Sequence, residues 1–142
     1  MPIIEPAPRL SEEELVGLYG AVGWTAYTAD PAGLRRAVDN SSFVVAARQH
    51  GRLVGLARAL SDDATICYLQ DVLVHPDHRR GGVGRALVSA VLSRYEHVRQ
   101  QVLLTDDEPA QRAFYESLGY AELRDHGTGS LRAFVRFDLR PQ

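Results

Sequence analysis

Residues 75–86 read His75-Pro76-Asp77-His78-Arg79-Arg80-Gly81-Gly82-Val83-Gly84-Arg85-Ala86. This stretch follows a β-rich run, Thr65–Val74, and opens an amphipathic run that begins at Val83. Three glycines in four residues remove side chains where a helix begins, so a ligand can approach the backbone closely. The first N–H groups of a helix have no partner inside it and carry partial positive charge, which attracts anions. With its neighbouring arginines, the stretch predicts a phosphate-binding turn.

The spacing of the glycines excludes two common classes of phosphate-binding loop. It is neither the Gly-x-x-x-x-Gly-Lys-Ser/Thr loop that binds nucleotide triphosphates nor the Gly-x-Gly-x-x-Gly turn that binds dinucleotides. Arg79, Gly82 and Gly84 instead fill an Arg/Gln-x-x-Gly-x-Gly/Ala signature, which resembles that of the GCN5-related N-acetyltransferases, the GNAT family. The strand that leads in, Leu69–Pro76, also resembles that family. Taken alone, the turn also fits a second interpretation, a glycine-rich strand-to-helix connection with an exposed basic rim.

Length and composition indicate one domain, residues 1–142. The chain is long enough to bury its own core, with 45% hydrophobic and 24% charged residues. A net charge of −2 gives no basic footprint for nucleic acid, so anion recognition must be local. No apolar run is long enough to span a bilayer and no signal-peptide pattern is present, so we expect a cytoplasmic protein without membrane contact. The single cysteine, Cys67, excludes an internal disulfide.

Hydrophobic periodicity predicts helices and strands in a definite order. A weak first strand within 2–9 precedes a helix capped at Ser11 and a short helix capped at Asp30. The later elements are strands Ser42–Arg48, Arg52–Leu60 and Thr65–Val74, a helix from Val83, a strand Gln101–Thr105, a helix near Pro109, and closing strands Tyr120–Leu123 and Leu131–Leu139. We expect a hairpin turn at 49–51 and a loop at 125–130.

Strands that bracket helices in this order predict the α+β (mixed α/β) class. The expected architecture is a central mixed, mostly antiparallel sheet with helices on both faces. This order matches the GNAT-type acyl-CoA N-acyltransferase fold from about Ser42 to Phe137, so the resemblance implies that fold. The N-terminal third matches it in outline only.

A second segment resembles the same family. Phe114–Tyr120 reads Phe-Tyr-Glu-Ser-Leu-Gly-Tyr and matches the aromatic-Tyr-x-x-x-Gly-aromatic pattern of the family's last helix. Two such segments, each in the expected structural setting, are far more specific than either alone. The chain departs from the family at Glu108 and Gln111, where Asn and Ala are common. Glu108 can still cap the helix, but the contact of the family's Asn with the pantetheine arm is not carried over.

The resemblance implies acetyl transfer from acetyl-CoA to an amine and assigns roles to residues. The pyrophosphate would bind the turn, whose cofactor-binding residues are Arg79, Arg80, Gly81, Gly82, Val83, Gly84 and Arg85. The pantetheine arm would lie along Val72, Leu73 and Val74, and the N–H of Val74 would stabilise the thioester oxygen as it gains charge. Tyr115 matches the family's catalytic tyrosine and would protonate the leaving thiolate. The alternative for Tyr115 is a packing tyrosine with a solvated hydroxyl.

The acceptor amine must lose a proton before attack, because an alkylamine with a pKa near ~10.4 is mostly protonated at neutral pH. Asp71 is the best carboxylate candidate for the base, directly or through water; a plain hydrogen-bond acceptor at a strand end is the alternative. The loop Gly23–Ala29 holds the chain's only tryptophan. By resemblance, Trp24 and Tyr27 would contact the acceptor, whereas their residue types alone equally fit a small core that joins two helices.

Two other chemistries are set aside. Cys67 lies in an apolar strand without a nearby histidine, so we interpret it as a core residue and not as an acyl-carrying nucleophile. His75 and His78 flank the turn without further ligands, and the family reaction uses no metal, so no metal is expected.

The predicted function is acetyl-CoA-dependent N-acetyl transfer to a primary amine of a small molecule, by direct attack in a ternary complex. A non-catalytic acyl-CoA-binding or sensing domain, kept open by Glu108 and Gln111, is one alternative, and a protein or peptide N-acetyltransferase is another. The resemblance is compatible with a homodimer.

Overall fold

The structure, a computed structural model, describes residues 2–125 and 131–138. The chain forms two compact units, Met1–Leu104 (unit 1) and Thr105–Gln142 (unit 2). Unit 1 contains, in order, β1 (Ile3–Pro6), α1 (Glu12–Ala21), α2 (Thr25–Thr28), α3 (Pro31–Asp39), β2 (Phe43–Gln49), β3 (Arg52–Ser61), β4 (Ile66–Val74), the 3-10 helix η1 (Pro76–His78), α4 (Val83–Arg94) and β5 (Gln100–Leu103). Unit 2 contains α5 (Pro109–Ser117) and the 3-10 helix η2 (Leu123–Asp125).

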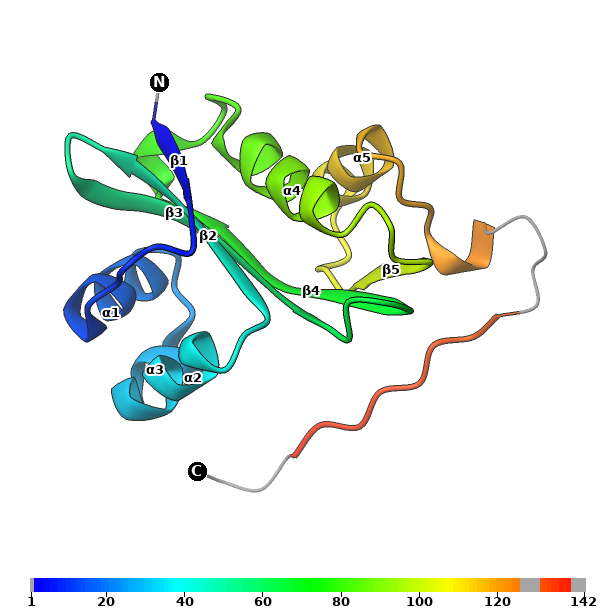
Figure 1. Cartoon of the computed structure of the whole chain (residues 1–142), viewed down its shortest axis with the longest axis horizontal. Coiled ribbons are helices and arrows are strands. Elements are labelled where there is room, and N and C mark those ends of the chain that lie inside the picture. The colour runs from blue at the N-terminus through cyan, green and yellow to red at the C-terminus, as the bar shows by residue number, and fades with distance from the viewer. Residues whose placement is uncertain (1, 126–130, 139–142) are drawn as a thin grey trace. The chain divides into compact units, whose positions relative to one another are not determined.

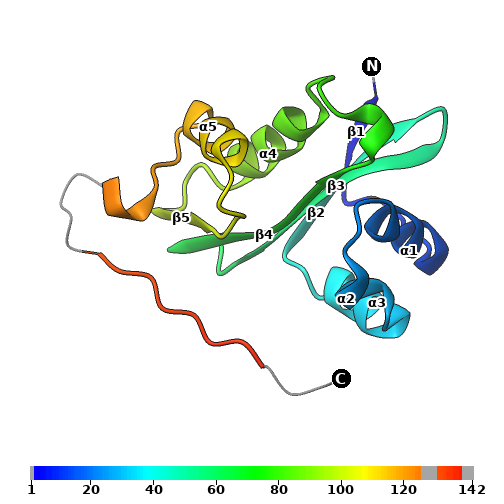
Figure 2. The ribbon, with the colours of Figure 1, turned by 180° about the vertical axis from the view of Figure 1, so that it is seen from behind.

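The five strands of unit 1 form one sheet in the order β1-β2-β3-β4-β5. The first four strands pair antiparallel with their neighbours, whereas β4 and β5 pair in parallel through Ile66–Leu69 of β4. Helices α1, α2 and α3 cover one face of the sheet and α4 covers the other (Figures 1 and 2). The predicted fold class, a mixed and mostly antiparallel sheet with helices on both faces, is confirmed.

The helix starts follow from side-chain caps. Ser11 Oγ accepts the N–H of Glu14 at 3.0 Å, and Asp30 Oδ1 accepts the N–H of Gly33 at 3.0 Å. Each cap gives a partner to one of the N–H groups that a first helical turn leaves unpaired. The sequence predicted both caps, and they fix where α1 and α3 begin on the sheet.

The core of unit 1 lies on both faces of its sheet. On the side of α1, the buried cluster consists of Leu10, Leu15, Leu18, Tyr19, Leu34, Val38, Ala46, Leu53, Leu56 and Leu73. On the other side, α4 buries Val83, Leu87, Val88 and Val91, which lie on the helix face that packs on the sheet. A Cβ built at Gly55 of β3 would lie 3.1 Å from both Leu87 Cδ1 and Val83 Cγ1. The missing side chain therefore allows α4 to pack closely on β3.

The start of α5 in unit 2 is as predicted, but its cap is not. Glu108 occupies the position before the helix, yet its side chain accepts no capping hydrogen bond. Pro109 fills the first turn, where its lack of an N–H costs nothing. Gly119 follows the helix with φ 95°, the left-handed conformation that ends helices. Glu108 was predicted to cap the helix; it occupies the N-cap position, but its side chain does not form the cap, which corrects that prediction.

The two closing strands predicted from the sequence do not form in the described residues, which is a second correction. Residues 120–122 and 131–138 are not in strands, and the first of these segments leads into η2. Alternation gives 131–137 one apolar face, but a strand persists only where its N–H and C=O groups pair with a neighbour. No such pairing forms in the described part of unit 2, and Leu131, Val135 and Phe137 are exposed. Leu139 and most of the predicted loop, 126–130, lie outside the described residues.

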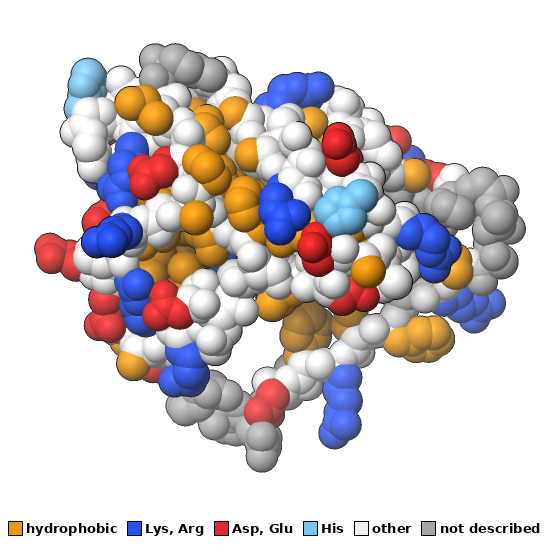
Figure 3. Space-filling model, viewed as in Figure 1, with side chains coloured by type: hydrophobic (Ala, Val, Ile, Leu, Met, Phe, Trp, Pro, Cys, Tyr) orange, Lys and Arg blue, Asp and Glu red, His pale blue; other side chains and the backbone are white. Residues whose placement is uncertain are grey.

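The surface carries charges of both signs. Arginine side chains and acidic side chains are interspersed on the face shown in Figure 3. This face therefore offers no continuous field of one sign to a polyanion. Among the helices of the described ranges, none has the length and apolar character needed to cross a membrane.

Candidate functional site

The turn that was predicted to bind phosphate lies at the N-terminus of α4. Gly82 precedes the helix and has φ 82°, a conformation that residues with side chains rarely adopt. A Cβ built at Gly82 would meet nothing within 4 Å, and one at Gly81 would meet only the carbonyl oxygen of His78, at 3.7 Å. Arg79 and Arg80 are exposed beside these glycines. The backbone is open to close approach, as the pyrophosphate of coenzyme A requires.

The strand that enters this turn has an open edge. β5 pairs with β4 only as far as Leu69, so within unit 1 the remainder of that edge has no strand partner. The N–H of His75 donates to Val54 O at 2.7 Å, toward β3. Alternate residues of an antiparallel pair direct their N–H and C=O groups to opposite sides. The peptide groups of Val72 and Val74 therefore point to the open edge.

The other predicted cofactor contacts have different surroundings. Leu73 lies between the two valines, so its peptide groups point to β3, and its side chain belongs to the core. Val83 is buried, so only its backbone could reach a ligand at the turn. Gly84 is half-buried, and Arg85 is exposed in the first turn of α4. The site predicted from the sequence is therefore mainly a backbone site.

A buried carboxylate lies on the α1 side of β4. Asp71, 3% exposed, accepts the Tyr19 hydroxyl at Oδ2 (2.9 Å) and the Tyr27 hydroxyl at Oδ1 (3.0 Å). Arg58 of β3, 6% exposed, donates from Nε to Oδ2 at 2.6 Å. Its Nη1 also donates to Ser41 Oγ, just beyond α3, at 3.3 Å. The Asp71 carboxylate on β4 thus ties α1, α2 and β3 together, and Arg58 extends the cluster to the end of α3.

The charges of this cluster, Tyr19–Tyr27–Arg58–Asp71, follow from its burial. Burial, and then the Asp71 carboxylate, raise the pKa of Tyr19, so its hydroxyl stays a neutral donor. Burial lowers the pKa of Arg58, because it disfavours the charged guanidinium. The attraction of the Asp71 carboxylate has the larger combined effect, so the pKa of Arg58 is raised. Both carboxylate oxygens of Asp71 accept hydrogen bonds. Its geometry is that of a hydrogen-bond acceptor, and its role as the base stays a prediction.

Aromatic rings surround the cluster. The Tyr19 ring lies 5.0 Å from that of Tyr27 and 5.9 Å from that of Trp24, between ring centroids, and Trp24 and Tyr27 are 6.0 Å apart. Trp24 and Tyr27 are half-buried and pack against the core beneath α1. The segment 23–29, predicted as a loop, contains the short helix α2, which is a correction. Its contacts make this segment, called the aromatic loop below, a small aromatic core, and the Tyr27 hydroxyl bonded to Asp71 gives it a polar end.

Sequence reasoning missed two members of the cluster. Neither Tyr19 nor Arg58 was assigned a functional role from the sequence. The signal at Arg58 was a charged residue within the apolar strand Arg52–Ser61, because a buried arginine needs a partner. The partner of Arg58 is Asp71, 13 residues further along the chain on β4, and it is also bonded by Tyr19, 52 residues away. The sequence does not give the strand register that brings these side chains together.

The predicted acid, Tyr115, lies on α5 in unit 2. Its ring contacts those of Phe114 and Tyr120, with centroids 5.0 Å and 5.8 Å away. Burial raises the pKa of Tyr115 above its ordinary value. The hydroxyl therefore keeps its proton at neutral pH, which is the state that a general acid requires.

Two residues considered for other chemistry have ordinary surroundings. Cys67 is buried in β4, and burial raises the pKa of its thiol, which disfavours the nucleophilic thiolate. The rings of His75 and His78 lie 6.0 Å apart, between centroids. They belong to no group of three metal-binding side chains in the part of the chain that the structure describes.

Comparisons with known proteins identify the family. The family model for an acetyltransferase (GNAT) domain matches residues 39–122. A relative from Prochlorococcus marinus, named as an uncharacterized N-acetyltransferase, ycf52-like, is 33% identical over 113 residues, which cover 75% of this chain and 61% of the relative. The solved structure of a GNAT-family acetyltransferase from Streptococcus pneumoniae has a TM-score of 0.84 at 26% identity, covering 99% of this chain and 100% of that one.

A third protein shares the fold: an aminoglycoside N-acetyltransferase in complex with coenzyme A has a TM-score of 0.66 at 19% identity, covering 99% of this chain and 96% of that one. The chain spans about three fifths of the length of the curated relatives it matches. The family match extends over more than half of the chain and includes both the glycine turn and the segment that carries Tyr115. The chain belongs to the GNAT family of acetyltransferases.

Proposed function

We propose that the chain is an acetyl-CoA-dependent N-acetyltransferase that moves an acetyl group to a primary amine of a small molecule by direct attack in a ternary complex. Bound acetyl-CoA would supply the thioester that the amine attacks and the thiol that leaves. The observation that carries the proposal is the open edge of β4, which runs directly into the glycine turn of α4. The edge suits an extended chain of amides and the turn suits phosphate, in the order in which coenzyme A carries them.

Backbone groups of unit 1 would hold the cofactor. The N–H groups of Arg79–Gly84 would bind the pyrophosphate, with added attraction from exposed arginines. The peptide groups of Val72 and Val74 would bond the pantetheine amides as a neighbouring strand does. The N–H of Val74 would stabilise the carbonyl oxygen as it gains negative charge. The coenzyme A complex of the aminoglycoside N-acetyltransferase, which shares the fold, supports this assignment.

Unit 2 would supply the acid. Tyr115 would donate its phenolic proton to the leaving thiolate, and its raised pKa keeps that proton available. The family match crosses the boundary between Leu104 and Thr105. This supports a single N-acetyltransferase domain built from both units.

The acceptor would lie beside the aromatic loop, with its amine near Tyr27 and its body against Trp24. Both oxygens of Asp71 are occupied, so Asp71 would act through Tyr27 and not by direct contact. The amine would pass a proton to the Tyr27 oxygen as the Tyr27 hydroxyl proton moves to Asp71. The neutral amine would then attack the carbonyl carbon, and the nitrogen would release its second proton to water. The carbon–sulfur bond would break as Tyr115 protonates the leaving sulfur.

The experiment that tests this function is acetyl-CoA-dependent thiol release across amines, polyamines, amino acids, aminoglycosides and lysine peptides. Turnover with one class, strongly slowed in Tyr115→Phe, is the expected result and names the acceptor. Turnover with peptides only would replace the small-molecule acceptor by a protein acceptor. If no amine of the panel gave thiol release while the protein still bound coenzyme A, the result would favour a sensing domain.

A further inference from the structure

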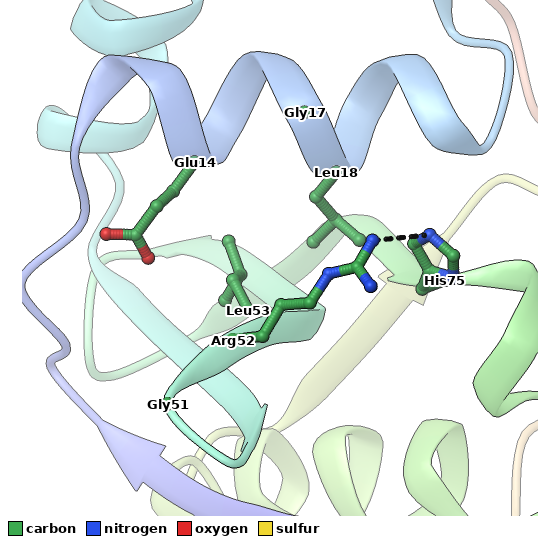
Figure 4. A pocket seen from close by; sticks show the side chains of 7 residues that line it. All are labelled: Glu14, Gly17, Leu18, Gly51, Arg52, Leu53 and His75. Carbon is green, nitrogen blue, oxygen red and sulfur yellow. Dashed lines mark hydrogen bonds between the residues drawn. The ribbon is translucent and has the colours of Figure 1, made fainter.

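A pocket of about 200 Å³ lies in unit 1 between α1, the hairpin that joins β2 and β3, and the end of β4. Figure 4 shows the Arg52 guanidinium next to the His75 ring at the pocket wall, with a dashed line between their nitrogen atoms and with Leu18 and Leu53 nearby. Gly17 faces the same space, and a Cβ built there would meet nothing within 4 Å. The proposed acetyl transfer uses none of these side chains.

The hydrogen-bond pattern of His75 fixes the position of its proton. The backbone N–H of Asp77 donates to His75 Nδ1 at 3.1 Å. A peptide N–H can only donate, so Nδ1 must accept and carries no hydrogen. A neutral imidazole has one N–H, which therefore sits on Nε2. The Asp77 carboxylate, 3.8 Å from Nδ1, is too far for a hydrogen bond that would reverse this assignment.

The Nε2–H of His75 faces a second donor. Arg52 Nη2 lies at hydrogen-bond distance from His75 Nε2, 3.3 Å, but a guanidinium has no acceptor atom, so this contact is a hydrogen bond only when Nε2 carries no hydrogen. Among the described residues, Arg52 forms no ion pair with a carboxylate. The pocket's own acid, Glu14, is engaged by Arg48 Nη1 at 2.7 Å. Two N–H donors thus converge with no acceptor between them, although both belong to groups that gain by pairing with one.

We propose that this pocket is a binding site for a small oxyanion, whose oxygen bridges His75 Nε2–H and the Arg52 guanidinium. A carboxylate or a phosphate satisfies both donors and neutralises Arg52. Leu18 and Leu53 give the pocket an apolar wall, so the ligand carries a short aliphatic body beside its charged group. Gly17, in the interior of α1, leaves room for that body at a cost in helix propensity. This oxyanion-binding proposal does not depend on the proposed acetyl transfer.

The test titrates the full chain with butyrate and, separately, with inorganic phosphate at constant ionic strength, followed by the imidazole nitrogen resonances of His75. The free protein should show the Nε2–H form, and the ligand should shift Nε2. Arg52→Gln should bind about tenfold to a hundredfold more weakly. Gly17→Leu, which fills the pocket without changing charge, should also lose binding, and Arg99→Gln, an exposed arginine elsewhere, should not.

Preference for butyrate or for phosphate would identify which oxyanion the site takes. An Nδ1–H form of His75 in the free protein would overturn the proposal. So would the absence of any His75 shift with both probes, or equal affinity in wild type, Arg52→Gln and Gly17→Leu. A thermal melt of each variant separates loss of the site from loss of the fold.

Discussion

At the scale of single residues, Asp71 holds together the helices on one face of the sheet. Its partners come from α1, α2 and β3, and none is close to it in sequence. A buried ion pair adds little net stability compared with apolar residues, because both charges lose their hydration. Removing one partner is different, since it leaves the other charge buried and unpaired. The cluster therefore fixes one arrangement of α1 and α2 on this face of the sheet.

We predict that Asp71→Ala lowers the free energy of unfolding by about 3–5 kcal/mol, because Arg58 and two hydroxyls lose their acceptor. The matched control is Asp39→Ala, which breaks the exposed Arg35–Asp39 pair of α3 and should cost no more than about 1 kcal/mol. Urea unfolding of both variants gives the comparison. Equal losses in the two would show that the buried cluster does not stabilise the fold.

Tyr115 gives a prediction about pH. Because burial raises its pKa, the hydroxyl stays protonated through neutrality, and kcat should fall on the alkaline side only above about pH 10. An acceptor amine of low pKa keeps amine ionisation out of this range. Tyr115→Phe should lower kcat by about 10²–10⁴-fold and remove the alkaline fall.

Tyr95→Phe is the control for Tyr115, because it removes the hydroxyl of a packed tyrosine on the sheet face of unit 1. It should keep both the rate and the alkaline fall. A Tyr115→Phe enzyme with wild-type kcat would rule out Tyr115 as the acid.

At the scale of elements, the position of α4 decides where the glycine turn that precedes it lies. The helix packs on β3 through Val83 and Leu87, and Gly55 gives them room. The turn at Gly82 is continuous with this helix, so packing in the core sets the direction of its first N–H groups.

We predict that Gly55→Val lowers the free energy of unfolding by about 1–3 kcal/mol through overpacking. The added atoms would press on Leu87, so Leu87→Ala should relieve part of that strain. Urea unfolding of the two single variants and the double variant then forms a double-mutant cycle with a favourable coupling energy of about 0.5 kcal/mol or more. If the losses in unfolding free energy of the two single variants simply added in the double variant, the absence of a side chain at Gly55 would not be what allows α4 to pack closely.

Local signals explain which elements the sequence could predict. The caps at Ser11 and Asp30, the hairpin at 49–51 and the glycine turn each depend on a few neighbouring residues. The Asp71 cluster depends on contacts across the sheet, and the sequence showed only an unexplained arginine at 58. The segment 131–138 has the alternation of a strand but no paired neighbour, and a periodic pattern cannot supply one.

At the scale of the whole molecule, the residues proposed for cofactor binding and for the base lie in unit 1, and the residue proposed as the acid lies in unit 2. Unit 1 carries the β4 edge, the glycine turn and the aromatic loop, and unit 2 carries Tyr115. Family membership covers both, because the matched region spans 39–122. The division predicts that changes at Tyr115 alter turnover and leave cofactor affinity intact, whereas changes at the turn remove binding itself.

The central claim, that the turn before α4 binds coenzyme A, is tested most directly by calorimetric titration of acetyl-CoA into wild type and Gly82→Glu. Two controls are matched: Gly82→Ala has the same backbone strain without the charge, and Gly23→Glu adds the same side chain at another glycine with φ 82°. We predict binding in wild type, about hundredfold or greater loss in Gly82→Glu, and retention in Gly23→Glu, with Gly82→Ala between them. Wild-type affinity in Gly82→Glu would contradict the account.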